Sequence, residues 1–289
     1  NFDAYDLINE KYIVRKLVLK NGSFAAKINA NGEENFNVFA PNDKNENKNF
    51  KFSLDQLTLN NFSINYQNIP LSQEYDFTIS DSKLKGQFSN KEYELNILSS
   101  MSVNKFELEG VNYISSKNAN TDIILLVKND PFSLTIKKGK LKIADMNFFL
   151  EGAYKSSKKD MINLNIKGNQ IKISEIFSIL PLDYPGIKTK YSSEGIFNFD
   201  GNLNGEMNNK QPLSFFVNFN ANNATLKDNL NNIQLEKIDL SGSFNNKEQK
   251  LKIINFSALI NEKIMSGNLE VSNFNEPNYF IKVDGIFDL

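Results

Sequence analysis

The sequence contains no cysteine, no histidine and no tryptophan. The absence of cysteine excludes a disulfide framework and thiolate chemistry. The absence of histidine removes the usual general base near pH 7, the commonest metal ligand and any Ser-His-Asp triad. Transition-metal sites built from carboxylates alone are uncommon. We therefore predict a protein that is not an enzyme and that needs no metal or other cofactor.

The chain also lacks an excess of charge and a long apolar run. Its 289 residues include 33 Lys and Arg against 34 Asp and Glu, a net charge of -1, which argues against binding to nucleic acid. The longest apolar runs, such as Ile123–Val127 and Leu213–Phe219, are far shorter than the ~20 residues that span a bilayer. Because the chain begins with Asn1 rather than Met, we expect it to be a piece of a longer protein.

Carboxylate pairs are the strongest candidates for chemistry. Glu92 with Glu94, and Glu107 with Glu109, are each spaced two apart, and glycosidases use two carboxylates. Because both pairs alternate with apolar residues, the pattern favours a solvated strand face. The segment Asp43–Asn47 is rich in oxygen ligands but lacks the central Gly and the spaced Glu of an EF-hand loop. The sequence therefore favours polar surface over a catalytic or calcium site.

What the sequence has in abundance is alternation of apolar and polar residues. The longest clean example is Leu213, Phe215, Val217 and Phe219. Such a period of two gives each strand one apolar and one polar face, as in antiparallel sheets. We predict an all-β, elongated antiparallel sheet of about 16 to 20 strands. Turn signals separate the runs at Asn21-Gly22, Ser89-Asn90, Lys138-Gly139, Asn204-Gly205 and Asn245-Asn246.

Helical signal is confined to two short segments, Phe2–Glu10 and Ser174–Leu180, the second of which ends at a proline. The stretch Pro181–Gly186 is the best internal boundary. We place an N-terminal segment at 1–180 and a C-terminal segment at 181–289, with one sheet continuing through both.

A loose internal repeat also occurs. Each copy has an alternating strand, then a small or turn residue, then an aromatic or aliphatic residue at which the alternation begins again. The copies are Lys16–Phe24 (KLVLKNGSF), Gln56–Ile64 (QLTLNNFSI) and Lys237–Phe244 (KIDLSGSF). Repeats of this kind stack into extended architectures in which each unit contacts mainly its neighbours.

The 24 Phe and 10 Tyr have two interpretations. They fill the core of a closed sandwich or barrel, or they line an open apolar trough. Both arrangements need the same alternation, so periodicity does not separate them. The residues by themselves favour the closed core.

Several segments resemble the AsmA-like family of bacterial envelope proteins, which includes AsmA and TamB. Tyr5–Phe39 is similar to the family's N-terminal pattern of a short helix, a strand and a Gly/Asn turn. Gly195–Gly205 (GIFNFDGNLNG), Leu226–Phe244 and Met265–Val271 (MSGNLEV) are similar to its later strands, and Ser174–Pro181 to its helical turn.

The resemblance implies a curled, repeating β-groove in the periplasm of a Gram-negative envelope. The body would be anchored to the inner membrane by a segment outside this chain. Such a protein would bind phospholipid acyl chains, help to move phospholipid between the inner and outer membranes, and so maintain the outer membrane. Our candidates for the lipid groove, chosen for their clean alternation, are Phe197, Phe199, Phe215, Val217, Phe219, Leu269 and Val271.

Two other functions stay open. The chain could be a scaffold that binds outer-membrane β-proteins by strand addition, which needs an exposed edge strand with few Lys or Pro residues. It could instead be an adhesin or a carbohydrate-binding β-solenoid, for which a closed, dry core is expected.

Overall fold

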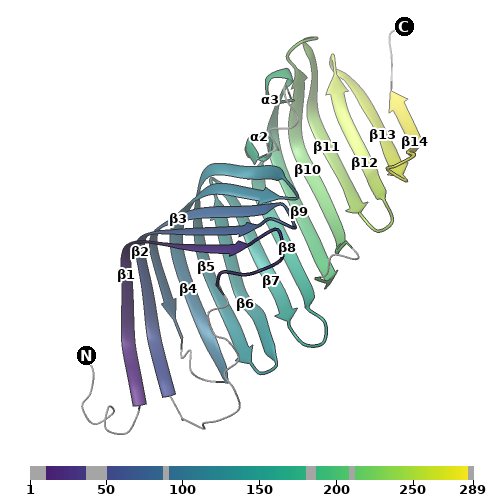
Figure 1. Ribbon diagram of the computed structural model, residues 1–289. Helices are drawn as coiled ribbons and strands as arrows, with labels where there is room; N and C mark the ends of the chain where they lie inside the picture. Colours follow the sequence, from purple (N-terminus) through teal and green to yellow (C-terminus); the bar gives the residue numbers. More distant parts are fainter. Residues whose placement is uncertain (1–10, 37–50, 87–90, 180–186, 208–211, 286–289) are drawn as a thin grey trace. The chain divides into compact units, whose positions relative to one another are not determined.

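The computed structural model describes residues 11–36, 51–86, 91–179, 187–207 and 212–285 (Figure 1). Most of these residues lie in the β-strands of a curled sheet. The predicted all-β fold with one or two short helices is therefore confirmed. The chain divides into two compact units. Unit 1 ends at Ala144, and unit 2 begins at Asp145.

The described part of unit 1 is a six-stranded sheet whose strands follow chain order. The strands are β1 (Lys11–Ile28), β2 (Lys51–Asn68), β3 (Gln73–Lys85), β4 (Glu92–Leu108), β5 (Val111–Asn129) and β6 (Phe132–Ile143). Neighbours are antiparallel except β1 and β2, which run parallel. The prediction of an antiparallel sheet is wrong for this pair. A parallel connection needs roughly a dozen residues or more, and residues 29–50 provide them.

The described part of unit 2 contains eight strands, also in chain order and antiparallel throughout. They are β7 (Met146–Lys155), β8 (Met161–Lys172), β9 (Tyr191–Glu206), β10 (Ser214–Asp228), β11 (Ile233–Asn245), β12 (Lys250–Ile260), β13 (Lys263–Ser272) and β14 (Asn278–Gly285).

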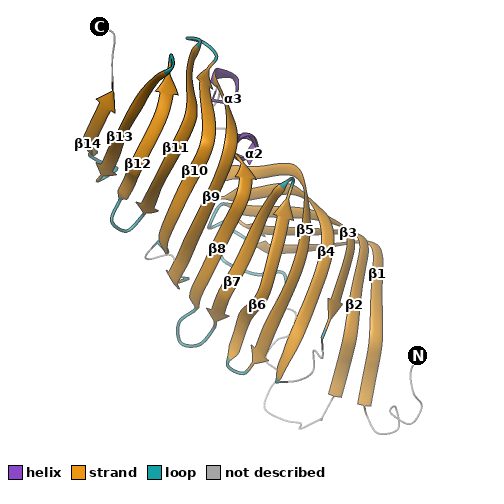
Figure 2. Ribbon diagram, turned by 180° about the vertical axis from the view of Figure 1, so that it is seen from behind, coloured by secondary structure: helices purple, strands orange, loops and turns teal. Residues whose placement is uncertain are grey.

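Two short helices, α2 (Ile173–Ile179) and α3 (Ile187–Lys190), contact β9 (Figure 2). The helix predicted at Ser174–Leu180 is thus confirmed as α2, which begins one residue earlier. The helix predicted at Phe2–Glu10 and the boundary at Pro181–Gly186 lie outside the described residues, so the division at 180/181 stays a prediction. Within the described ranges, no helix is both long and apolar enough to cross a membrane.

The strands are fewer and longer than predicted. The described ranges contain fourteen strands, which are 8 to 19 residues long. Three of the predicted turns lie inside strands. Asn21-Gly22 lies within β1, where Asn21 has a φ of 54°, and Lys138-Gly139 lies at a register shift of β6. Asn204-Gly205 belongs to the last residues of β9. Asn245-Asn246 does form the turn after β11, and Ser89-Asn90 lies outside the described residues.

The first two copies of the repeat lie side by side in the parallel pair. Lys16 faces Gln56 and Phe24 faces Ile64, so equivalent positions of the repeat are neighbours. Asn21 and its counterpart in β2, Asn61, both have positive φ, at 54° and 46°. The Asn61 Nδ2 donates a hydrogen bond to the Asn21 Oδ1 at 2.8 Å. β1 and β2 therefore have the same backbone irregularity at equivalent positions of the repeat. The strands of unit 1 bend partway along their length (Figure 1).

Burial is shallow in both units. Thirteen apolar residues are buried in the described ranges, and none of them is Phe or Tyr. In unit 2 the buried cluster is made mainly of small residues, Ala221, Ala224 and Ala258 with Ile238. Aromatic side chains therefore lie on the faces of the sheets rather than in a sealed interior.

Candidate functional site

The seven residues predicted to line a lipid groove all lie in unit 2, on one face of its sheet. Phe197 and Phe199 are on β9, and Phe215, Val217 and Phe219 are on β10. Leu269 and Val271 are on β13, three strands away from β10. Cross-strand partners in an antiparallel sheet point to the same side, so the register fixes which residues share this face.

Two rows of register partners join these residues across the sheet. One row runs from β8 to β14 through Gly168, Phe199, Phe219, Gly242, Ile253, Leu269 and Ile281. The next row runs through Ile166, Gly201, Val217, Phe244, Leu251, Val271 and Tyr279. We call this side the apolar face of unit 2. Every member of the two rows is apolar, aromatic or glycine, so the face carries no charged or amide side chain along them.

The seven side chains are all half-buried. Each contacts its neighbours on the sheet and still presents part of its surface to solvent. A sealed core would bury such residues almost completely, since core side chains are close-packed. The face is therefore available to a ligand, although whether it binds lipid stays a prediction.

Glycines on neighbouring strands make room for the phenylalanine rings. Phe199 lies over Gly168 on β8, where an added Cβ would clash with its ring. Phe219 lies over Gly242 on β11, where an added Cβ would be 2.7 Å from the ring Cζ. Aromatic side chains that cover glycines of adjacent strands are a known device of sheet packing. On this face, the rings of Phe199 and Phe219 therefore extend over the neighbouring strands β8 and β11.

Ring contacts extend the face beyond the seven predicted residues. Phe197 stacks on Phe219 with centroids 5.9 Å apart. Phe148 contacts Phe199 at 6.2 Å, and Phe244 bridges Phe215 and Phe274 at 6.2 Å and 5.8 Å. The predicted set missed three of these residues, Phe148, Phe244 and Phe274. The first two have alternating neighbours that could have identified them, whereas Phe274 follows β13 in a turn and has no such signal.

The opposite face of unit 2 is polar and rich in asparagine. The Asn202 Nδ2 donates to the Oδ1 atoms of Asn163 and Asn165 at 2.9 Å and 2.7 Å, so amides connect β8 and β9. Lys167 forms an ion pair with Asp200 at 2.9 Å, and the hydrogen bond that Lys167 donates to Asp200 raises the pKa of Lys167.

Two open hollows, of about 500 Å³ and 570 Å³, are lined mostly by this polar face. The first includes Asn222, Asp239 and Asn268. The second includes Asn198 and Asn220 and is also bordered by Phe199 and Phe219. Apart from those two rings, the hollows do not involve the predicted lipid-groove residues.

Unit 1 has a comparable apolar face. The rings of Tyr66, Tyr75 and Phe106, from β2, β3 and β4, stack in sequence with centroids 5.6 Å and 4.8 Å apart. Burial, with a smaller contribution from Tyr66, raises the pKa of the Tyr75 hydroxyl. These three rings are half-buried, as are the phenylalanine rings of the two rows on the apolar face of unit 2.

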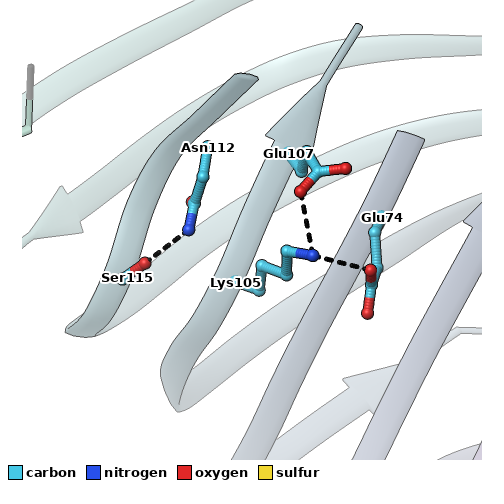
Figure 3. A network of polar contacts seen from close by, with 5 residues as sticks. All are labelled: Glu74, Lys105, Glu107, Asn112 and Ser115. Atoms are coloured by element: carbon cyan, nitrogen blue, oxygen red, sulfur yellow. Dashed lines mark hydrogen bonds and ion pairs between the residues drawn. The ribbon is translucent and has the colours of Figure 1, made fainter. Parts of the chain in front are cut away.

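Three of the four glutamates that the sequence offered for acid–base chemistry, Glu92, Glu94 and Glu107, form ion pairs. In Figure 3, Lys105 lies between Glu74 and Glu107, at 2.7 Å and 2.8 Å. The hydrogen bonds that Lys105 donates to Glu107 and, with a smaller effect, to Glu74 raise the pKa of Lys105. Glu92 pairs with Lys128 at 3.0 Å, and Glu94 pairs with Lys137 at 3.1 Å.

These contacts offset the repulsion between carboxylates on adjacent strands. Glu109 is exposed in the turn after β4.

Across the described ranges, no group of three or more Asp or Glu side chains is placed to hold a metal ion. The segment Asp43–Asn47 lies outside them. The expectation that the protein is not an enzyme stays a prediction.

Comparison with known proteins gives no match: no family model, no curated protein and no solved structure is significantly similar to this chain. The resemblance to the AsmA-like family therefore depends on sequence segments alone.

Proposed function

We propose that the chain binds the acyl chains of phospholipids on the apolar face of its sheet and helps to move phospholipid between the inner and outer membranes. The observation that carries the proposal is the pair of uninterrupted apolar rows, from β8 to β14, whose phenylalanine members are half-buried. A soluble protein rarely leaves such a surface without a partner.

The energetics of lipid transfer explain why such a surface would be useful. Exposing two chains of ~16 carbons to water costs on the order of 25 kcal/mol, at ~0.8 kcal/mol per CH₂. A protein that carries lipid must replace that apolar contact at every step. Strands ~4.8 Å apart, each contributing apolar side chains to one face, provide closely spaced contacts. No bond is made or broken, which fits a sequence without His or Cys.

The location follows from the resemblance and belongs to the same proposal. The protein would work in the periplasm, held to the inner membrane by an anchor outside this chain. The polar face, with its amide network and ion pairs, would stay in contact with water.

Photo-crosslinking in cells tests the proposal directly. A photoreactive residue at Phe215 or Phe219 should capture phospholipid. Phe216 provides a matched control, since it is the same residue type on the adjacent position, points to the polar face and is 39% exposed. Asn218, also on the polar face, is a second control. Equal lipid capture at all four positions would refute the proposal.

Strand addition is the second candidate, and one observation favours it. β14 ends the order of described strands, and all of its residues are exposed. Tyr279, Phe280 and Ile281 are 63% to 65% exposed, and Lys282 is the strand's one lysine. An edge with so little protection can pair with another strand. Photo-crosslinking from Phe280 separates the two functions, since a scaffold would capture an outer-membrane protein in a fixed ratio instead of lipid.

A further inference from the structure

A row of hydroxyl side chains crosses the apolar face of unit 1. The row of register partners runs, from β2 to β6, through Leu59, Ser82, Ser99, Thr121 and Leu141. The rows on either side are almost wholly apolar. They consist of Leu57, Leu84, Ile97, Ile123 and Gly139, and of Phe62, Ile79, Met101, Ala119 and Ile143. The hydroxyls thus form a polar line within apolar surroundings.

Two of these hydroxyls have no hydrogen-bond partner among the described residues. The Ser99 Oγ and the Thr121 Oγ1 are both buried and unpaired, and Ser99 as a whole is only 9% exposed. The two residues are direct register partners on β4 and β5, so their side chains are neighbours. A buried hydroxyl without a partner is unfavourable, because it loses its hydrogen bond to water and gains none.

Packing requires small side chains here but does not require hydroxyls. The row lies beside an irregularity of the sheet, where Ser80 is inserted in β3 opposite β4. Unit 2 meets the same demand beside its own irregularity with Ala221 and Ala224 on β10. Alanine at position 99 would therefore fit equally well, and it would leave no unpaired oxygen.

We infer that Ser99 and Thr121 donate hydrogen bonds to the two ester carbonyl oxygens of a diacyl glycerolipid seated on the apolar face of unit 1. This inference rests on the proposed function and names the lipid class. Ester carbonyls accept hydrogen bonds and donate none, whereas each hydroxyl has a proton to donate. The aliphatic rows on both sides contact the acyl chains and must shift their side chains to admit the ester groups.

Competition between two synthetic lipids tests this pairing. The probes are dioleoyl phosphatidylcholine and its dioleyl diether analogue, which differ only in the two carbonyl groups. The purified full chain is mixed with vesicles that contain equal amounts of both, and the protein-bound lipids are counted by mass spectrometry. We expect the protein to select the diester about tenfold, since two hydrogen bonds together are worth about that factor.

The double variant Ser99→Ala/Thr121→Val should bind both lipids in equal amounts, with a thermal unfolding midpoint equal to or above that of the unchanged protein. Thr121→Ser, which keeps the hydroxyl, should retain the selection. Ser102→Ala is the control, because it removes a hydroxyl from the polar side of β4.

The outcomes separate the two proposals. Binding of both lipids without selection by the unchanged protein overturns the inference and leaves the proposed function standing. Binding of neither lipid overturns the proposed function. Loss of selection together with a lower unfolding midpoint would assign Ser99 and Thr121 a structural role and would also overturn the inference.

Discussion

Units 1 and 2 place small residues on the apolar face where their strands are irregular, but they use different ones. Unit 2 uses Ala221, Ala224 and Ala258, which pack together in its buried cluster. Unit 1 uses Ser82 and Ser99 at 2% and 9% exposure. The shared feature is size, which the crowded inner side of a bulge requires. The difference is polarity, which packing does not require, so the comparison isolates the hydroxyls as the feature that needs a further explanation.

The largest effect is expected from enlarging the crowded site of unit 2. Gly195 has a φ of +112°, and an added Cβ would lie 2.5 Å from the Ala224 Cα. Gly195→Ala should lower the local free energy of opening of β9 and β10 by about 3 kcal/mol, through backbone strain and overlap. Native-state hydrogen exchange measures this quantity unit by unit. Gly110→Ala is the control: its φ is +77°, but no atom of the described residues lies within 4 Å of an added Cβ, so the loss should be about 1 kcal/mol.

A reciprocal exchange of small residues tests the difference in polarity. Ala221→Ser would place a hydroxyl at a site that is 3% exposed and surrounded by apolar groups, and should destabilise unit 2 by about 1–3 kcal/mol. Ser99→Ala in unit 1 should be neutral or stabilising, because the oxygen it removes has no partner. Both values come from hydrogen exchange of the unit concerned. Destabilisation of unit 1 by Ser99→Ala would show that its hydroxyl is structural after all.

The irregularity shared by β1 and β2 offers a smaller effect. Asn61 has a φ of 46° and donates to the Asn21 side chain. Asn61→Ala should destabilise unit 1 by about 1–2 kcal/mol, since a left-handed conformation is unfavourable for alanine. Asn61→Gly should stay close to the unchanged protein, because glycine adopts positive φ readily. If the two variants are equally destabilised, the side-chain hydrogen bond rather than the backbone conformation is the important contact.

The smallest effect concerns an ion pair of unit 2. The hydrogen bond from Lys250, at 2.6 Å, lowers the pKa of the Glu270 carboxyl. A lowered carboxyl pKa contributes stability that is complete above the ordinary glutamate value of about 4.3 and disappears as the pH falls through the lowered value. In the Glu270→Gln variant, the thermal unfolding midpoint should therefore fall less steeply than in the unchanged protein as the pH is lowered. Lys250→Gln should have a similar effect, and an unchanged acid slope in both variants would contradict the assignment.

The alternation in the sequence was enough to predict an all-β sheet and to place seven residues that share one face. Phe215, Val217 and Phe219 lie on that face because a period of two leaves no other option on a regular strand. The parallel pairing of β1 and β2 could not be predicted in this way, since alternation is identical for parallel and antiparallel neighbours with one exposed face.

The turns were the weaker part of the prediction, for a physical reason. Asn-Gly favours positive φ, which serves both a hairpin turn and an irregularity inside a strand. Asn21 uses it for the second purpose. The unpaired hydroxyls of Ser99 and Thr121 were also hidden, because only the register reveals that they are neighbours on an apolar face.

The in-register pairing of the two repeat copies has an evolutionary consequence. When two parallel strands carry the same sequence, each residue meets its own equivalent, so a copied strand brings a compatible neighbour with it. A duplication event could add such a strand at the β1 side without requiring new complementary side chains. A protein built on this rule can be lengthened in increments, and its span can be adjusted by the number of copies that a gene retains.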